Sequence, residues 1–200
     1  MFYADTIPTP LGPVIAVVDD NNALVQLSLR REENPAKTAA YLVHGEPAAW
    51  DKSRLAPVTA QLQEYFEGTR TAFDLPLALR GTPFQQRVWD EMTRIPYGTT
   101  LSYKQLAARV GRPDACRAVG GASGKNPVWI VVPCHRIVGA GGTLTGYAGG
   151  LTTKQRLLAL EGAGSGLFAR GTQNAEAHVR PVSLGPCLET THPDAPRERT

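Results

Sequence analysis

Hydrophobic positions in the first thirty residues predict a β-hairpin. Two apolar runs, Pro13–Val18 and Ala23–Leu29, flank the polar turn Asp19–Asn22, which is the pattern of two antiparallel strands joined by a short loop. The following residues, 31–54, are polar and contain Pro and Ala without a clear period, so they predict no regular element.

A single helix is predicted before the middle of the chain. Apolar and aromatic residues recur at helical spacing in Pro57–Glu67, and Gly68 is a typical residue to end such a helix. Residues 71–81 then fit an extended segment that links two parts of the chain. We therefore expect an N-terminal domain of residues 1–80 and a second domain of residues 81–162.

The second half begins with a pattern typical of a helix-turn-helix. Thr82 and Pro83 suit the cap and the first turn of a helix whose apolar residues continue to Ile95. A short helix is predicted within Ser102–Gly111 and, after a tight turn, a second one rich in small residues within Ala115–Ala122. Small residues let the second helix approach another molecule closely. A close-packed helical pair without a nucleic-acid role has the same pattern and stays open.

The rest of the chain is predicted to contain a strand, a loop, a helix and a tail. Apolar Val128–Val132 indicates a buried strand, which is predicted to end at Pro133 and to leave the next residues exposed, because proline cannot donate to a ladder. Residues 139–150 are rich in glycine but lack the Gly-Lys-Ser/Thr of a phosphate loop. A helix is predicted over Thr152–Glu161, and residues 163–200, which are polar and without a period, are expected to be a disordered tail.

Composition narrows the class of protein. With 42% hydrophobic residues the chain can form a core, no segment has the length of a membrane span, and the N-terminus lacks the pattern of a secretory signal. The three cysteines, Cys116, Cys134 and Cys187, are a poor disulfide framework and are not spaced as zinc ligands. We therefore expect a cytoplasmic protein in a reducing compartment, with no metal and no membrane partner.

Positive charge is concentrated in the second half of the chain. Residues 81–162 contain ten Lys and Arg against four Asp and Glu, a net charge of +6, whereas residues 1–80 carry −3 and residues 163–200 carry no net charge. A locally basic domain favours a polyanion such as nucleic acid. An ordinary solvated basic face is the alternative.

A cysteine and a histidine stand side by side in the run VVPCHR, residues 131–136. A thiol is mostly protonated near neutral pH, so Cys134 needs a base, and His135 is the candidate. Neighbouring side chains in an extended segment point to opposite faces, so contact between these two requires a turn or a bridging water. Glu161 is the first carboxylate after this run, which makes it the candidate to orient His135.

Four runs in residues 81–162 form a specific pattern: FQQRVW, IPYGTTLSYKQLA, CRAVGGASGKNPVWIVVPCHRIVGAGGTLTGYAGGL and LLALEG. This pattern closely resembles the O6-alkylguanine-DNA alkyltransferases, and PCHR preceded by RAVGGA is its most specific part. The resemblance implies an α/β (α+β) protein. Its N-terminal domain would be a ribonuclease-H-like sheet and helix, followed by a mainly helical domain with a helix-turn-helix of winged-helix type.

The resemblance also implies roles for individual residues. Cys134 would accept the alkyl group, with His135 as its base through water, Glu161 orienting His135, and Asn126 bracing the turn beneath. The residues implied to bind DNA are Arg117, which would fill the gap left by the flipped nucleotide, and Tyr103, Ala118, Gly120 and Ser123. The residues implied to form the site of the flipped base are Tyr147, Ala148, Ile137, Trp129 and Lys154. Of these, Tyr147 would hydrogen-bond the base, backbone groups of residues 134–148 would read its edge, and Lys154 would lie near the pocket loop.

The implied function is DNA repair by direct reversal of damage. The alkyl group of O6-alkylguanine, and of O4-alkylthymine, in duplex DNA would move irreversibly to Cys134 after the nucleotide is flipped out. Because the thioether product has no hydrolytic escape, each molecule would act once. The implied partner is double-stranded DNA containing alkylated guanine, with no cofactor. The protein is expected to be a monomer, and cooperative binding along DNA is left open.

Two positions of this sequence depart from the pattern of the resembled family, and two functions other than alkyl transfer are also considered. Ala148 stands where some relatives have Ser, and Trp129 where others have Pro or a small residue. Binding-only sensors of the alkyltransferase-like type share this architecture but carry Trp in place of the acceptor, so Cys134 argues against that function. A Cys-His hydrolase would turn over an ester or a peptide and has no need of a basic helix pair.

Overall fold

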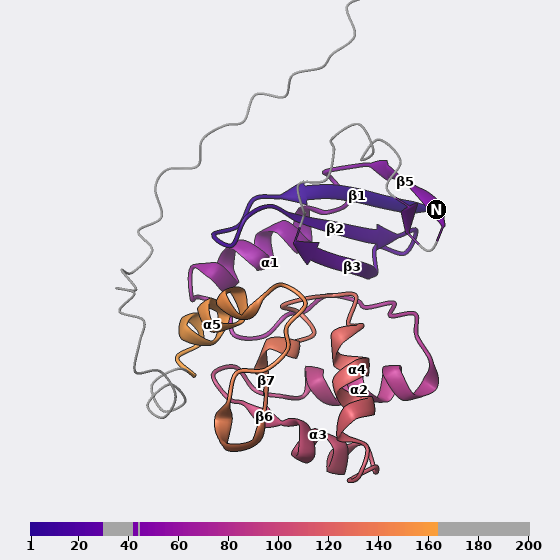
Figure 1. The fold of residues 1–200 in the computed structure, drawn as a ribbon. Coiled ribbons are helices and arrows are strands. Elements are labelled where there is room, and N and C mark those ends of the chain that lie inside the picture. The colour runs from indigo at the N-terminus through magenta and orange to yellow at the C-terminus, as the bar shows by residue number, and fades with distance from the viewer. Residues whose placement is uncertain (30–41, 44, 164–200) are drawn as a thin grey trace, which may run out of the picture.

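The N-terminal half of the chain is a five-stranded sheet packed against one helix (Figure 1). The computed structural model describes residues 1–29, 42–43 and 45–163. The strand order is β3-β2-β1-β5-β4, in which β1 runs parallel to β5 and the other neighbours are antiparallel. The elements are β1 (Phe2–Ile7), β2 (Val14–Asp19), β3 (Leu24–Leu29), β4 (Leu42–Val43), β5 (Glu46–Trp50) and α1 (Ala56–Phe66).

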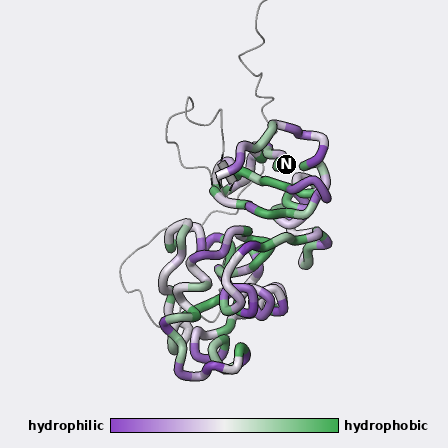
Figure 2. Tube along the Cα trace, turned by 90° about the vertical axis from the view of Figure 1, so that its right-hand side faces the viewer, coloured by the Kyte–Doolittle hydropathy of each residue, from purple (hydrophilic) through white to green (hydrophobic). Residues whose placement is uncertain are grey.

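Both faces of the central strand β2 are buried. Val14, Ala16 and Val18 pack into the main core, which also holds the buried residues of α1, whereas Ile15 and Val17 belong to a smaller cluster on the other face. Figure 2 shows the hydrophobic residues along the strands of the sheet and hydrophilic residues at its edges and turns. Burial on both faces explains why this strand is an unbroken apolar run in the sequence.

The predicted hairpin and the predicted helix of this half are confirmed, but three strands, β1, β4 and β5, were missed. The segment of β1 mixes buried apolar residues with Asp5 and Thr6, and its burial does not alternate strictly. The segment of β5 reads EPAAW, has no β-branched residue, and becomes a strand by pairing with β1. Pairing with a neighbour can outweigh a weak local preference. Residues 31–54, which give little signal in the sequence, therefore contain β5 and the two-residue strand β4.

The C-terminal half is mainly helical (Figure 1). Its two short strands, β6 and β7, pair in parallel. The elements are α2 (Pro83–Thr93), β6 (Leu101–Ser102), α3 (Tyr103–Arg109), α4 (Cys116–Gly124), the 3₁₀ turns η2 (Cys134–Arg136) and η3 (Ala140–Gly142), β7 (Ile137–Val138) and α5 (Leu151–Leu160).

Local sequence sets the starts of the first two of these helices. Thr82 caps α2 and Ser102 caps α3, and in both cases the glutamine three residues later completes a capping box. The predicted helices at these positions and at the position of α5 are confirmed. A turn with Gly111 in the left-handed region (φ 72°) separates α3 from α4, so the predicted pair of short helices is confirmed as well.

The predicted strand over Val128–Val132 is wrong. Val128 makes only an isolated bridge to Leu27, and the chain then turns, with Ile130 in the left-handed region at φ 69°. Val128, Ile130 and Val132 are buried because this turn lies inside the core. A short apolar run signals burial, and its period alone does not distinguish a strand from a buried turn. Cys134 is therefore not exposed after a strand end, since only 9% of its surface is accessible.

The two halves share one hydrophobic core and are joined by backbone hydrogen bonds. The amide of Leu27 on β3 donates to the carbonyl of Pro127 at 2.9 Å, and its carbonyl accepts from the amide of Trp129 at 2.8 Å. The sheet thus supports the segment that leads into the PCHR run. The helix α1 lies beside α5 (Figure 1), where Tyr65 of α1 donates a hydrogen bond to Glu161.

Two further expectations concerned membrane-spanning segments and the C-terminal tail. The helices in the described ranges are all too short or too polar to cross a membrane. The expected disordered tail, from residue 164 onward, lies outside the described residues.

Candidate active site

The PCHR run forms a tight turn, η2, whose support comes from Asn126. The side-chain amide of Asn126 donates to the carbonyl of Val132 at 2.7 Å, and its oxygen accepts from the amide of Val128 at 3.0 Å. One side chain therefore holds both ends of the buried turn that precedes Cys134. The 3₁₀ conformation also removes the difficulty of an extended segment, in which Cys134 and His135 would point to opposite faces.

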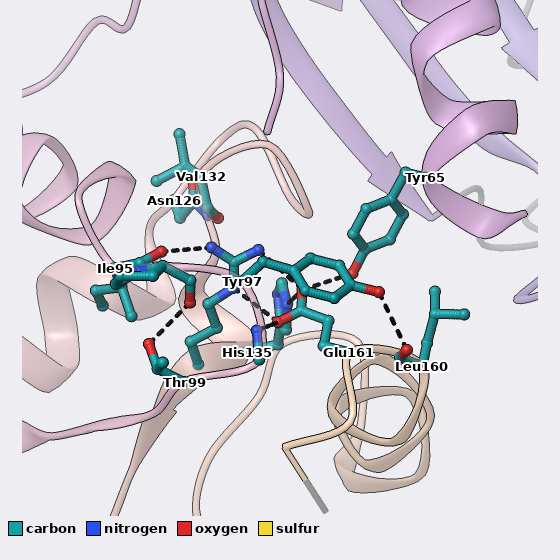
Figure 3. Close-up of polar contacts among 12 residues, drawn as sticks. Tyr65, Ile95, Tyr97, Thr99, Asn126, Val132, His135, Leu160 and Glu161 are labelled. Atoms are coloured by element: carbon teal, nitrogen blue, oxygen red, sulfur yellow. Dashed lines mark hydrogen bonds and ion pairs between the residues drawn. The ribbon is translucent and has the colours of Figure 1, made fainter. Parts of the chain in front are cut away.

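The carboxylate of Glu161 lies at the centre of a buried network (Figure 3). Its Oε1 accepts from His135 Nε2 at 2.8 Å, from the Tyr65 hydroxyl at 2.8 Å and from Arg136 at 2.9 Å. Its Oε2 accepts from Arg136 Nε at 2.8 Å and from the amide of Gly98 at 3.2 Å. Glu161 was predicted to orient His135, and the structure places the two in direct contact.

The network keeps Glu161 ionised. Burial alone would raise the pKa of this carboxyl group, but the hydrogen bonds from His135 and Arg136 outweigh burial and hold the pKa at about 2. An ionised carboxylate only accepts hydrogen bonds, so His135 must carry its proton on Nε2. Burial lowers the pKa of His135, against the opposing effect of Glu161, so the ring is neutral at physiological pH.

These facts leave the second ring nitrogen of His135 as a proton acceptor. Nδ1 is buried and has no hydrogen-bond partner among the described residues. In a neutral imidazole protonated on Nε2, this atom has a free lone pair. The adjacent Cys134 has a thiol whose pKa is raised by burial to about 11, although a hydrogen bond from Asn126 and the charge of Lys154 act in the opposite direction. The resting thiol is protonated and needs a base to become a nucleophile.

Cys134 opens into a cavity of about 610 Å³ between the helix pair and the glycine-rich loop. The rings of Trp129 and Tyr147 lie 5.5 Å apart at its wall, and a Cβ at Gly149 would come within 2.8 Å of both. The lining residues are Tyr103, Cys116, Arg117, Gly120, Ser123, Gly124, Trp129, Cys134, Thr145, Gly146, Tyr147 and Ala148.

Most residues that the sequence assigned to DNA or base binding meet at this cavity. Tyr103 and Arg117 reach it from α3 and α4, and Tyr147 reaches it from the loop. Gly120, Trp129 and Ala148 line it as well, and Ala118 is exposed on α4.

Three of the assigned side chains are buried. Ile137 is fully buried in the core and is not among the residues that line the cavity. Lys154 is also buried and holds the loop from behind, since its ammonium group donates to the carbonyls of Ile137 and Thr145. Ser123 lies at the cavity but is only 5% exposed, and its hydroxyl donates to the sulfur of Met92 rather than standing on the outer face of α4.

Sequence reasoning missed Arg136, Tyr65 and Gly98. Arg136 is part of PCHR but was counted only as one positive charge of a basic domain. In the structure it is buried, pairs with Glu161 and donates to the carbonyl of Ile95. Arg136 and Lys154 therefore do not contribute to a basic surface. Within the ranges that the structure describes, no group of three or more Cys, His, Asp or Glu could hold a metal ion.

Comparison with known proteins places the chain in a family. The DNA-binding domain of 6-O-methylguanine DNA methyltransferase matches residues 83–163, and the ribonuclease-like domain of the same family matches residues 2–79. The chain belongs to the 6-O-methylguanine-DNA methyltransferase family. The resemblance seen in the sequence is thereby confirmed, together with a mixed α/β fold that has an N-terminal sheet and a helical C-terminal half.

Curated members of this methyltransferase family are similar over most of their length. A methylated-DNA–protein-cysteine methyltransferase of Mycobacterium tuberculosis is 44% identical over 162 residues, which are 80% of this chain and 93% of the relative. The constitutive enzyme of Bacillus subtilis is 45% identical over 154 residues, covering 76% and 90%. A crystal structure of Mycobacterium tuberculosis OGT in complex with DNA superposes with a TM-score of 0.68 at 41% identity, covering 80% of this chain and 93% of that one.

A first prediction concerns Gly98, whose turn touches the end of α5. Gly98 has φ 72°, and a Cβ there would lie 2.8 Å from the backbone oxygen of Glu161. Gly98→Ala should lower the free energy of unfolding by about 1–2 kcal/mol for the left-handed backbone and a further ~1–3 kcal/mol for the clash. Chemical denaturation measures the loss.

Gly111→Ala is the matched control. Gly111 has the same φ of 72°, but a Cβ there would meet no described atom within 4 Å. The Gly111→Ala variant should lose only the part of the free energy of unfolding that comes from the left-handed backbone, and it should keep full methyltransferase activity. Equal losses in the two variants would contradict the close packing of the Gly98 turn on Glu161.

Proposed function

We propose that this protein repairs DNA by moving the alkyl group of O6-alkylguanine to Cys134, once per molecule. The observation that carries this proposal is the placement of Cys134 at the cavity, next to a histidine whose tautomer is set by a buried carboxylate. The family and the methyltransferase names of its relatives support the same reaction. O4-alkylthymine presents an alkyl group on an equivalent exocyclic oxygen and is proposed as a second substrate.

The proposed reaction is a nucleophilic displacement. His135 Nδ1 takes the proton of the Cys134 thiol, through a water molecule, and the thiolate attacks the alkyl carbon. A sulfur–carbon bond forms and the bond from that carbon to guanine O6 breaks. The electron pair of the broken bond stays on the guanine, which takes up, by way of water, the proton that His135 accepted from the thiol and becomes the normal base. Asn126 is proposed to assist by favouring the thiolate, in line with its lowering effect on the pKa of Cys134. Because the thioether is stable, Cys134 is not regenerated and the protein cannot accept a second alkyl group.

The pair α3–α4 is proposed to bind DNA as a helix-turn-helix of winged-helix type, with residues 81–162 as the DNA-binding and transfer domain. A base must leave the duplex before its O6 substituent can reach a buried thiol. Arg117 is exposed and lines the cavity, so it is placed to fill the vacated position, while Ala118 and Gly120 allow close approach. Tyr103 is proposed to press on the neighbouring phosphate. Because damage occurs in any sequence, affinity should come from phosphate contacts.

The flipped base is proposed to lie between the loop and Trp129. The hydroxyl of Tyr147 is buried and has no partner within the described part of the chain, so it is available to the base. The indole of Trp129 is held by a hydrogen bond of 3.2 Å to the carbonyl of Asn126. A cavity of about 610 Å³ is within the usual range for a small ligand. A fixed indole at its wall is proposed to favour small alkyl groups.

The first test of this function follows the methyl group. The protein is incubated with a duplex that carries one O6-methylguanine, and the masses of the protein and of the DNA are measured by mass spectrometry. We expect one methyl mass on the peptide that contains Cys134 and none with Cys134→Ser, because an alcohol is a far weaker nucleophile at neutral pH. Cys116→Ser is the control, since this second thiol lines the same cavity.

Three outcomes separate the alternatives. Binding of the duplex without methyl transfer would indicate a binding-only sensor. Turnover of an ester or peptide would indicate a hydrolase. Loss of transfer in Cys116→Ser instead of Cys134→Ser would show that Cys116 is the acceptor.

The role of Arg117 gives a separate prediction. Arg117→Ala should slow repair of duplex DNA about 10-fold or more, which corresponds to ~1.4 kcal/mol, and leave the reaction with free O6-methylguanine nearly unchanged, since the free base needs no extrusion. Rates are measured under single-turnover conditions. Arg156→Ala on α5, which contributes nothing to the cavity lining, removes the same charge as a control. Equal slowing of both substrates by Arg117→Ala would place Arg117 in the base pocket instead.

A further inference from the structure

The N-terminal half contributes one polar atom to the network around His135. Tyr65 belongs to α1, and its hydroxyl lies 2.8 Å from Oε1 of Glu161, 96 residues away in the chain (Figure 3). His135 Nε2 binds the same oxygen at the same distance. Two hydrogen-bond donors from different halves of the molecule therefore share one carboxylate oxygen, and one of these donors is the proposed base.

The surroundings of Tyr65 fix both its position and its direction of donation. The side chain is fully buried, and its ring contacts the rings of Phe66, Phe73 and Tyr97 at centroid distances of 5.3, 5.4 and 6.1 Å. Burial and the neighbouring carboxylate raise the pKa of the Tyr65 phenol. The hydroxyl is therefore protonated at neutral pH and donates to Glu161.

We propose that Tyr65 is a positioning residue for alkyl transfer, whose hydroxyl competes with His135 for Oε1 of Glu161 and so sets the basicity of His135. This inference rests on the proposed roles of His135 and Cys134. It makes α1 part of the proton-accepting machinery, in addition to its packing role in the N-terminal half.

The sign of the effect follows from electrostatics. Each hydrogen bond that a carboxylate accepts spreads its negative charge and leaves less of it for the other donors. Without the Tyr65 hydroxyl, more of the charge of Glu161 acts on His135, which stabilises the protonated imidazolium. Arg136 and Lys154, the other charged groups that act on His135 or Glu161, are not altered, nor are the neighbouring Cys134 and Tyr97. The pKa of His135 should therefore rise when the hydroxyl is removed.

The test is the pH profile of Tyr65→Phe, which keeps the ring and removes only the hydroxyl. Single-turnover methyl transfer from a duplex with one O6-methylguanine is measured across pH 5–9. The acid limb should move to higher pH by about 0.5–1 unit, a fraction of what a hydrogen bond to a charged group is worth. On that limb the rate should fall about 3- to 10-fold, whereas the plateau rate and DNA affinity should stay within about 2-fold, because the ring still packs.

Tyr97→Phe is the matched control. Its hydroxyl donates to the backbone carbonyl of Leu160 at 3.1 Å, and its ring packs against the ring of Tyr65, but it makes no hydrogen bond to Glu161 among the described residues. Its profile should superpose on that of the wild type. Profiles of Tyr65→Phe and Tyr97→Phe that coincide would overturn the inference, and so would a rate loss in Tyr65→Phe that is the same at every pH.

A second variant covers the case in which Tyr65→Phe does not fold. Tyr65→3-fluorotyrosine keeps the hydroxyl and makes it a stronger donor, so the acid limb should move to lower pH. No shift, or a shift to higher pH, would overturn the inference. Failure of the proposed function would be distinguishable, because the wild-type protein would then not transfer the methyl group at any pH.

Discussion

Glu161 is a buried carboxylate with five hydrogen-bond contacts, and the organisation of the site depends on it. Burying an unpaired charge is costly, and removing one partner of a buried ion pair typically costs about 3–5 kcal/mol. Arg136 supplies the compensating charge, and His135, Tyr65 and Gly98 satisfy the remaining acceptor positions. Because all of these partners are needed at once, η2, α1 and the Gly98 turn are held in one relative arrangement around the end of α5.

This arrangement explains how a neutral, buried histidine can act as a base. An ionised Glu161 requires the proton on Nε2, which leaves the lone pair of the buried, unpartnered Nδ1 free to accept a proton. The same network removes Arg136 from any contact with DNA. Lys154, buried beneath the loop, is likewise a structural cation that ties Ile137 to Thr145. DNA binding therefore depends on a smaller set of exposed cations than the net charge of residues 81–162 suggests.

Local signals in the sequence predicted the parts of the fold that local chemistry determines. Thr82, followed by Pro83, and Ser102 marked helix starts as cap residues, and in the structure a glutamine three residues later completes a capping box at each. Glu161 was chosen as the partner of His135 because it is the first carboxylate after PCHR, and the structure places the two 2.8 Å apart. The strand β5 and the buried turn after Val128 were missed because pairing and burial determine them, and neither leaves a period in the sequence. Tyr65 could not be found because its partner lies 96 residues away and an aromatic residue on a helix face is usually only core.

The most direct test of the central claim is the tautomer of His135. Nitrogen-15 NMR of the imidazole in the folded, unreacted protein distinguishes a protonated ring nitrogen from one with a free lone pair. The account predicts a protonated Nε2 and a lone pair on Nδ1 at neutral pH, with Glu161→Gln weakening this preference. A proton on Nδ1, or a doubly protonated ring at neutral pH, would contradict the proposed role of Glu161 and the use of His135 as the base for Cys134.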